Sequence, residues 1–507
     1  MPQLSPTRYT ADGAVNFCFA GYPSAKVYAE SQGNKWIQHL IFGDYIKILD
    51  LEIANNRVKV KSRNNTGWIS VDKLQKERLL EVNFVDIGQG DGCHVVTPDD
   101  QHFLIDAGEN DNMSRYLAWR FNLYAREKPE NIQPLPFAFR VIISHSDQDH
   151  YGGFGRIFGR PSVRVSEILH NGIVQRPGES SDFGTVVNGH ITSLVADTAA
   201  MRTIIDDPQK RKGTNSSYPV VLHAALAHNP NVQYKMVRLS DGFISGLDST
   251  VMVNGKPLSM KLLGPITVQQ GGVETLPLIK DAGKTKNGHS VLIRLDYGKA
   301  RILLGGDLNE EAGEMIVDHF AQAGQLDELR VDAAKACHHG SNHFFYPFLT
   351  HVNAAATVIS SGDEESYAHP RPDAIGALGK CGYGDSPLVF STELARSTKE
   401  VTRKELAKTQ KLLEKVSKER AELATLLVIA APTPTDLARI ETLRKSIVKS
   451  NKEINSTLTK YGMINLRTDG ERMIIAQKLE IEAGYGKWDI HELEYDAVEK
   501  RFVRTVS

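Results

Sequence analysis

The sequence has little of what marks secreted or membrane-embedded proteins. Its 507 residues include four cysteines, which lie far apart and form neither a Cys-x-x-Cys zinc pair nor a disulfide framework. Residues 1–10 lack the apolar core of a signal peptide, and no run of 18 apolar residues occurs. The formal net charge is −1, so any basic surface must be local. We therefore expect a cytoplasmic protein that does not bind a membrane.

The first part of the chain has the pattern of a small β domain. Short β-rich runs at 45–49, 57–61 and 67–71 are separated by Asn-Asn turn signals. The run that contains Gly67-Trp68-Ile69 resembles the last strand of bacterial SH3-like barrels. This resemblance implies an SH3-like β-barrel over residues 1–78, which binds a peptide or polymer or docks on its own neighbouring domain.

Beyond residue 79 the pattern changes to strands that alternate with helical stretches. Strand-like runs occur at 81–86, 94–96, 103–106 and 141–143. Helical stretches are found at 113–124 and 310–323, and residues 291–304 predict a β-hairpin around Tyr297-Gly298. Such alternation indicates an α/β layered architecture, which we assign to residues 79–393.

Residues 394–460 differ from the rest and predict an inserted antiparallel helical hairpin. Ile440, Ile447 and Ile454 repeat every seven residues, as in a coiled coil, and two prolines separate the two helical runs. The apolar positions expected in the seam also include Leu406, Leu413, Val416, Leu423, Leu427 and Leu437.

Basic residues outnumber acidic ones along the first of these helices. The stripe that we expect to bind nucleic acid or a protein partner contains Lys404, Lys408, Lys411 and Lys415. Such a stripe can bind a polyphosphate backbone, but a solvated coiled-coil face or a protein-docking arm has the same pattern. No aromatic residues interleave with the charges, which argues against a channel that stacks single-stranded bases.

A short segment carries the chemistry. His145, Asp147, Asp149 and His150 fall within six residues, directly after the apolar run 141–143. A loop at a strand end can gather these side chains around one point, and a divalent cation offsets the cost of desolvating them. Two later strand-like runs end in Asp307 and in the His338-His339 pair. A carboxylate such as Asp307 can bridge two cations, and a late histidine can complete the second site.

These motifs follow one another in a characteristic order. They are 84–91, 104–108, 145–153, 303–307, 338–341 and 367–370. The chain resembles the soluble hydrolase domain of ComEC-type DNA-uptake proteins, a branch of the metallo-β-lactamase superfamily. The resemblance implies an αββα sandwich that residues 461–507 complete. In it, residues 461–470 would pair with 387–392 as a terminal β-hairpin that carries the helical insertion.

The resemblance also implies a centre of two divalent ions, Mn²⁺ or Zn²⁺. The implied metal ligands are His145, Asp147, Asp149, His150, Asp307 and His338, and the choice between His338 and His339 as the late ligand stays open. The implied catalytic residues are Asp149, His339 and His369. Asp86, Asp91 and Asp106 are expected to orient the ligand histidines, or, for Asp86 and Asp106, to bind metal themselves.

Two departures from the superfamily pattern affect the first ion. Asp147 stands where a histidine is common, which favours manganese. Thr285 stands at the usual middle histidine. His289 or Asn287 could replace that ligand, or the first ion is held less tightly.

We therefore expect a metal-dependent phosphodiesterase or nuclease that acts on nucleic acid through a metal-activated water. The alternatives are a hydrolase of another ester, such as a phosphocholine ester or a lactone, and a non-enzymatic binding subunit of a larger complex. The SH3-like module and the helical hairpin are the candidate sites for a protein partner.

Overall fold

The contacts of the chain divide it into two units, Met1–Ala395 with Gly462–Ser507, and Arg396–Tyr461. The computed structural model describes residues 4, 8–9, 15–128, 130–176, 183–211, 217–362, 368–393, 403–458, 463–483 and 486–505. The chain is a mixed α/β protein, which confirms the predicted class. None of the described helices is both long enough and apolar enough to cross a membrane.

An eight-stranded sheet forms from residues 8–75, in the order β1-β2-β5-β6-β7-β3-β4 with β8 on β2. Its strands are β1 (Arg8–Tyr9), β2 (Asn16–Ala20), β3 (Ser24–Tyr28), β4 (Trp36–Ile41), β5 (Tyr45–Ile48), β6 (Arg57–Ser62), β7 (Asn65–Ser70) and β8 (Leu74–Gln75). In β6 the buried residues Val58 and Val60 alternate with exposed lysines, the period-2 pattern of a strand with one face in the core.

This small sheet packs against the C-terminal strands of the same unit. Ile41 and Phe42 form an apolar cluster with Ile474 and Ala476. At its edge, the Nδ1 atom of His39 accepts a hydrogen bond from Lys487 N at 3.1 Å, and the His39 carbonyl accepts one from Trp488 Nε1 at 3.2 Å. An acceptor nitrogen must be unprotonated, so this contact requires the neutral form of His39.

Acid should weaken this contact. Burial, assisted by the charge of Lys26, lowers the pKa of His39 to about 4, whereas an unfolded histidine titrates near 6.5. Between these values only the unfolded chain binds the proton, so the free energy of unfolding falls as pH drops from about 6.5 toward 4. In urea titrations at several pH values, His39→Gln should make this fall smaller than in the wild type. His351→Gln, at a half-buried histidine, is the control and should leave this fall unchanged. Equal dependence of the free energy of unfolding on pH in His39→Gln and the wild type would contradict the role given to His39.

Two larger sheets form the body of the first unit. The ten-stranded sheet has the order β18-β15-β14-β11-β10-β9-β28-β29-β30-β31. Its strands are β9 (Leu80–Val85), β10 (Gly92–Val96), β11 (His102–Ala107), β14 (Phe139–Ile143), β15 (Val165–His170), β18 (Gln233–Met236), β28 (Met463–Thr468), β29 (Arg472–Ala483), β30 (Gly486–Asp496) and β31 (Arg501–Arg504). The seven-stranded sheet has the order β19-β20-β23-β24-β25-β26-β27. Its strands are β19 (Met252–Val253), β20 (Lys256–Gly264), β23 (Leu292–Tyr297), β24 (Ala300–Gly305), β25 (Ala333–Lys335), β26 (Ala356–Ile359) and β27 (Leu388–Ser391).

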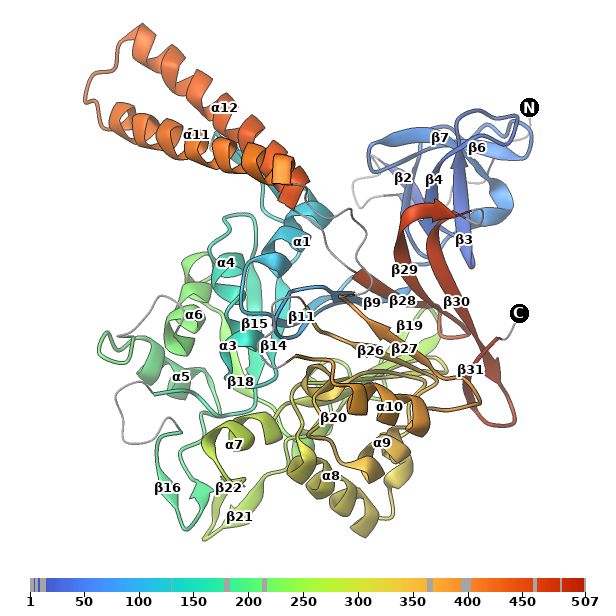
Figure 1. Cartoon of the computed structure of the whole chain (residues 1–507), viewed down its shortest axis with the longest axis vertical. Coiled ribbons are helices and arrows are strands. Elements are labelled where there is room, and N and C mark those ends of the chain that lie inside the picture. Colours follow the sequence, from blue (N-terminus) through green and yellow to red (C-terminus); the bar gives the residue numbers. More distant parts are fainter. Residues whose placement is uncertain are drawn as a thin grey trace. The chain divides into compact units, whose positions relative to one another are not determined.

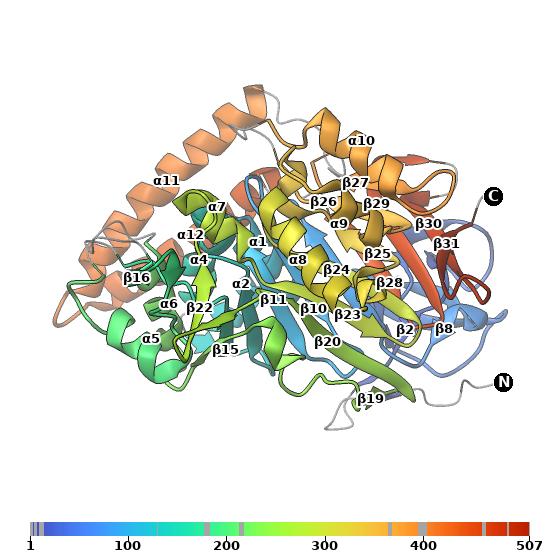
Figure 2. The ribbon, with the colours of Figure 1, turned by 90° about the horizontal axis from the view of Figure 1, so that it is seen from below.

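The two sheets share one apolar core, and helices cover their other faces. Val82 and Phe103 of the first sheet pack with Leu295, Ile302 and Val358 of the second. The outer face of the first sheet packs against α1 (Asn112–Phe121), α4 (Phe154–Phe158), α5 (Thr198–Ile205) and α6 (Tyr218–Ala224). The outer face of the second packs against α8 (Glu310–Gln322) and α9 (Tyr346–Val352), as Figure 2 shows. Both faces of these strands are buried, which explains why they read as nearly continuous apolar runs.

The pairing predicted for the strands that flank the insertion is wrong. β27 pairs with β26 in the seven-stranded sheet, whereas β28 lies between β9 and β29 in the ten-stranded sheet. Both segments are rich in apolar residues, which reveals a strand but not its partner. The turn at Asp469-Gly470 joins β28 to β29 instead. The hairpin predicted at 291–304 is confirmed, with Tyr297 opposite Ala300.

The second unit is an antiparallel pair of helices, α11 (Arg403–Leu427) and α12 (Pro434–Leu458), which run side by side in Figure 1. Glu422 lies opposite Arg439 at 2.7 Å, and Glu419 opposite Ser446 at 2.7 Å. Val416, Ile447 and Ile454 are buried in the seam as expected.

Other seam positions differ from the prediction. Leu413, Leu427 and Leu437 are about half exposed, at 50%, 53% and 54%. Leu412 and Leu426 are the more buried members of each leucine pair, because a two-helix seam follows a 3.5-residue repeat and only one leucine of an adjacent pair can face it. The side chain of Leu406 lies outside the described residues.

Replacing the helical hairpin should therefore require a linker rather than a turn. We expect the first unit to stay folded when residues 397–460 are replaced by about 12 Gly/Ser residues, which reach roughly 18 Å on average. A two-residue turn in place of residues 393–462 should unfold it, because a turn brings its ends within about 7 Å, whereas β27 and β28 belong to different sheets and stacked sheets lie about 10 Å apart. Circular dichroism melting and gel filtration of both variants provide the measurement. Unfolding of the long-linker variant, or a native melting temperature with the short turn, would contradict this.

Candidate metal centre

The segment 144–153 follows β14 and forms α3 (Gln148–Tyr151) and the start of α4. It lies where parallel strands end, because β11, β14 and β15 run in the same direction. The glycines of this segment are required by close packing: a Cβ atom at Gly153 would lie 2.2 Å from Ala107 O. The motif is thereby held against the end of β11.

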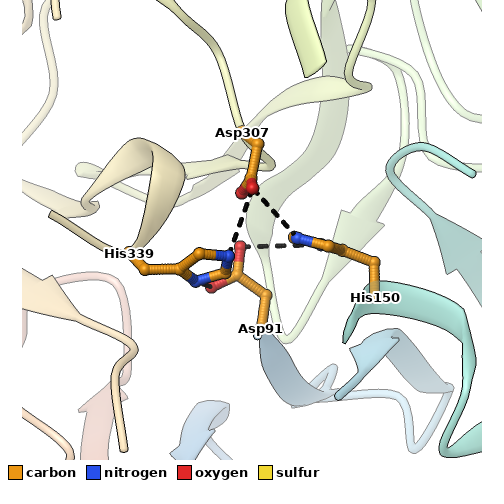
Figure 3. Close-up of side chains that lie close together, drawn as sticks. All are labelled: Asp91, His150, Asp307 and His339. Atoms are coloured by element: carbon orange, nitrogen blue, oxygen red, sulfur yellow. Dashed lines mark ion pairs between the residues drawn. The ribbon is translucent and has the colours of Figure 1, made fainter. Parts of the chain in front are cut away.

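Four buried side chains converge beside this segment (Figure 3). They are Asp91 before β10, His150 on α3, Asp307 after β24, and His339 in the turn Cys337–Gly340. One ligating atom from each lies within 4.8 Å of the others. Asp91 and His150 lie next to the ends of β10 and β14 in the ten-stranded sheet. Asp307 and His339 follow β24 and β25 in the seven-stranded sheet, so the centre lies where the two sheets meet.

The inner atoms of this cluster fit a divalent cation. Asp307 Oδ2 lies 3.2 Å from both His150 Nε2 and His339 Nε2. Yet both nitrogens, and Asp307 Oδ1, are buried without a hydrogen-bond partner of good geometry. Asp149 borders the same point, with its carboxylate oxygens 3.6 Å from His339 Nε2 and 4.0 Å from His150 Nε2. Two imidazoles and two carboxylates suit manganese or zinc.

The electrostatics of the centre also favour a cation. Burial lowers the pKa of His150 and His339, but neighbouring carboxylates, Asp307 foremost, more than offset it. The pKa of His150 is raised well above its ordinary value, and that of His339 to about 10. Burial raises the pKa of Asp307, yet His150 and His339 hold it well below its usual range. The centre thus has a negative potential that positive charge must balance.

Two carboxylates, Asp106 and Asp91, lie next to the Nδ1 atoms of the histidine rings. Asp106 accepts hydrogen bonds from His150 Nδ1 at 2.8 Å and from Ser144 N at 2.8 Å, so His150 Nε2 points inward. Asp91 Oδ1 lies 3.1 Å from His339 Nδ1, which also faces Ser360 O at 3.3 Å, and the other oxygen of Asp91 pairs with Lys335. We therefore interpret Asp91 as orienting His339 rather than as a ligand. The orienting role expected of Asp106 agrees with this geometry.

The residues expected at the first ion are arranged differently. His145 is buried, with Nδ1 3.0 Å from Ser144 Oγ and Nε2 3.5 Å from Asp147 Oδ2. Asp147 forms an ion pair with Lys286. These two side chains adjoin the centre without joining the cluster of four.

The residues considered for the middle ligand are occupied elsewhere. The Thr285 hydroxyl donates to Asp281 O at 2.8 Å and accepts from Ile279 N at 2.9 Å. His289 Nε2 lies 2.7 Å from Pro277 O, and burial lowers the pKa of His289 to about 4. The Asn287 amide, in the orientation that satisfies its neighbours, donates to Asp147 Oδ2 at 2.9 Å. Asp86 Oδ1 accepts a hydrogen bond from Gly88 N at 3.2 Å, so this carboxylate stabilises the turn and is not placed as a metal ligand.

Of the two adjacent histidines, His339 rather than His338 faces the centre. His339 Nε2 faces the centre, whereas His338 Nε2 is 3.9 Å from Asp307 Oδ2 and its side chain is 20% exposed. Both residues have positive φ, 51° and 52°, a strained conformation for a non-glycine residue. The ring of His369 lies beside both, with centroids 5.8 and 6.2 Å away. Tyr367 of the same motif lies outside the described residues.

The lysines expected on the hairpin are partly described. Lys408 and Lys411 are exposed, and Lys415 pairs with Glu419 at 3.7 Å. The side chain of Lys404 lies outside the described residues.

The lysines Lys335 and Lys286 were missed as parts of the site. Asp91 was expected to orient a histidine, and it ends the turn Gly88-Gln-Gly-Asp91. A Cβ atom at Gly90 would lie 1.7 Å from Asp149 O, so this turn packs directly on the metal motif. The lysines carry no sequence signal, because their partners are distant in the chain.

Comparisons with known proteins add little. No protein-family model and no curated protein matches the chain. Among solved structures, NlpC2 from Trichomonas vaginalis is similar over 18% of this chain at 18% identity, with a TM-score of 0.12. The match spans 38% of that protein's chain.

Proposed function

We propose that the chain is a metal-dependent hydrolase of the metallo-β-lactamase type that cleaves phosphodiester bonds, with nucleic acid as its substrate class. The observation that carries the proposal is the convergence of His150, His339 and Asp307, with buried atoms that lack hydrogen-bond partners, at the meeting edge of two sheets. The order helix, sheet, sheet, helix supports the same fold assignment.

Each residue of the centre then has a definite task. His150, His339, Asp307 and Asp149 would hold a divalent ion, manganese or zinc. When bound, such an ion makes water acidic near neutral pH and offsets charge on phosphoryl oxygens. Asp106 and Asp91 keep the ligand nitrogens aimed at it. His369 is placed beside His338 and His339 to contact the substrate phosphate or to protonate the leaving oxygen.

A phosphodiester is favoured over other esters by the hydrogen-bond donors around the centre. The Lys286 ammonium and the imidazoles of His338 and His369 adjoin it and can donate to a substrate anion. The exposed Lys408 and Lys411 give the helical unit a polyphosphate-binding stripe. That unit and the SH3-like module remain the candidate surfaces for a protein partner.

The test is an assay of chelator-treated protein restored with Mn²⁺ or Zn²⁺. Substrates are DNA, RNA, bis(4-nitrophenyl) phosphate, a carboxylic ester and a lactone. We expect phosphodiester hydrolysis, with manganese at least as effective as zinc because oxygen ligands equal nitrogen ligands in number. Hydrolysis of the carboxylic ester or lactone alone, or full activity in His150→Ala, would overturn the proposal.

A further inference from the structure

Of the two carboxylates in the metal motif, Asp147 is paired with a cationic side chain of the protein itself. Lys286 on α7 (Ala282–Gly288) forms an ion pair with Asp147 Oδ1, and the lysine side chain is only 16% exposed. The pair links residues 139 positions apart, so the fold brings the ammonium group here rather than local sequence.

Two further donors use the other oxygen of Asp147. His145 Nε2 lies 3.5 Å from Oδ2. The Asn287 amide, in the orientation that satisfies its neighbours, donates to Oδ2 at 2.9 Å and to Gly283 O at 3.1 Å. Both oxygens of Asp147 therefore face nitrogen donors of the protein itself.

A second ion of the superfamily type does not fit this arrangement. It would need Asp147, His145 and a middle ligand, yet Thr285 and His289 are bonded to backbone carbonyls. An ion at Asp147 would also lie next to the Lys286 ammonium, and like charges at contact distance repel. By contrast, no lysine or arginine pairs with Asp149 or Asp307 in the described part of the chain.

We propose that Lys286 takes the place of the second metal ion, so that the chain binds one divalent cation, at His150, His339, Asp307 and Asp149. The ammonium group supplies the second positive charge of the site. This inference rests on the proposed metal-dependent function and narrows it to a single-ion centre.

The experiment counts ions on the full-length chain. Chelator-treated wild type is titrated with MnCl₂ by calorimetry, and the bound ions are counted by native mass spectrometry. We expect one Mn²⁺ per chain in the wild type and a second, weaker equivalent in Lys286→Ala, because Asp147 is then free to bind an ion. Lys286→Gln, a neutral side chain of similar length, provides a second test if Lys286→Ala melts early.

Lys284→Ala is the matched control. Lys284 lies on the same helix and pairs with Glu311 at 2.7 Å, away from Asp147, so this variant should keep one ion. Two ions with similar Kd in the wild type, or a single ion in both Lys286 variants, would overturn the inference while leaving the proposed function in place. Mn²⁺ binding that persists unchanged in His150→Ala would overturn the proposed centre itself.

Discussion

Replacing Asp307 by alanine is expected to lower phosphodiester hydrolysis about a thousandfold or more, equal to roughly 4 kcal/mol in the activation barrier. Asp307 Oδ2 lies 3.2 Å from both inner histidine nitrogens, so no other residue can take over its place in the centre. Its charge also balances the cation. Without it, bound metal should fall below one equivalent, which atomic emission of the purified variant measures.

Two comparison variants make this result specific. Asp106→Asn keeps the ligands but loosens His150, so activity should fall only about 10- to 100-fold. Asp318→Ala, at an exposed position of α8, should leave activity and metal content at wild-type levels. If Asp307→Ala retained activity within tenfold of wild type with metal bound, the centre would be misassigned.

The metal motif could be predicted from the sequence because its residues are adjacent. His145 to His150 follow an apolar strand, and a strand end is where parallel neighbours bring their loops together. The class of the fold was predictable as well, because buried strands are visible in the sequence as short apolar runs. What the sequence could not reveal is which side chain of an adjacent pair faces the centre.

His338 and His339 illustrate this limit. Their order depends on two consecutive positive φ angles, a conformation that is uncommon for non-glycine residues even though histidine is among the types enriched in it. The partners of β27 and β28 were also unpredictable, because a buried strand has the same apolar composition in either sheet. The pairs Asp147–Lys286 and Asp91–Lys335 join residues 139 and 244 positions apart, so only the folded chain reveals them.

Lys335→Ala is expected to have the largest effect on stability. Lys335 lies in β25 with its side chain 4% exposed, and it pairs with Asp91, which is 1% exposed. Its ammonium also donates to Ala336 O at 3.1 Å. Burial raises the pKa of Asp91, but Lys335 and His339 hold it below its usual range. Removing the lysine leaves a buried carboxylate that lacks its main counter-charge.

Breaking a buried pair in this way costs about 3–5 kcal/mol in the free energy of unfolding. Urea titration followed by circular dichroism measures it. The control is Lys299→Ala, because Lys299 pairs with Glu471 at 2.7 Å while both side chains are nearly half exposed, and such solvated pairs contribute little to stability. The double variant Lys335→Met with Asp91→Asn should recover part of the loss, since it leaves no unpaired charge. A loss below about 1 kcal/mol in Lys335→Ala would show that Asp91 is neutralised by His339 alone, and that the lysine does not hold the orienting carboxylate in place.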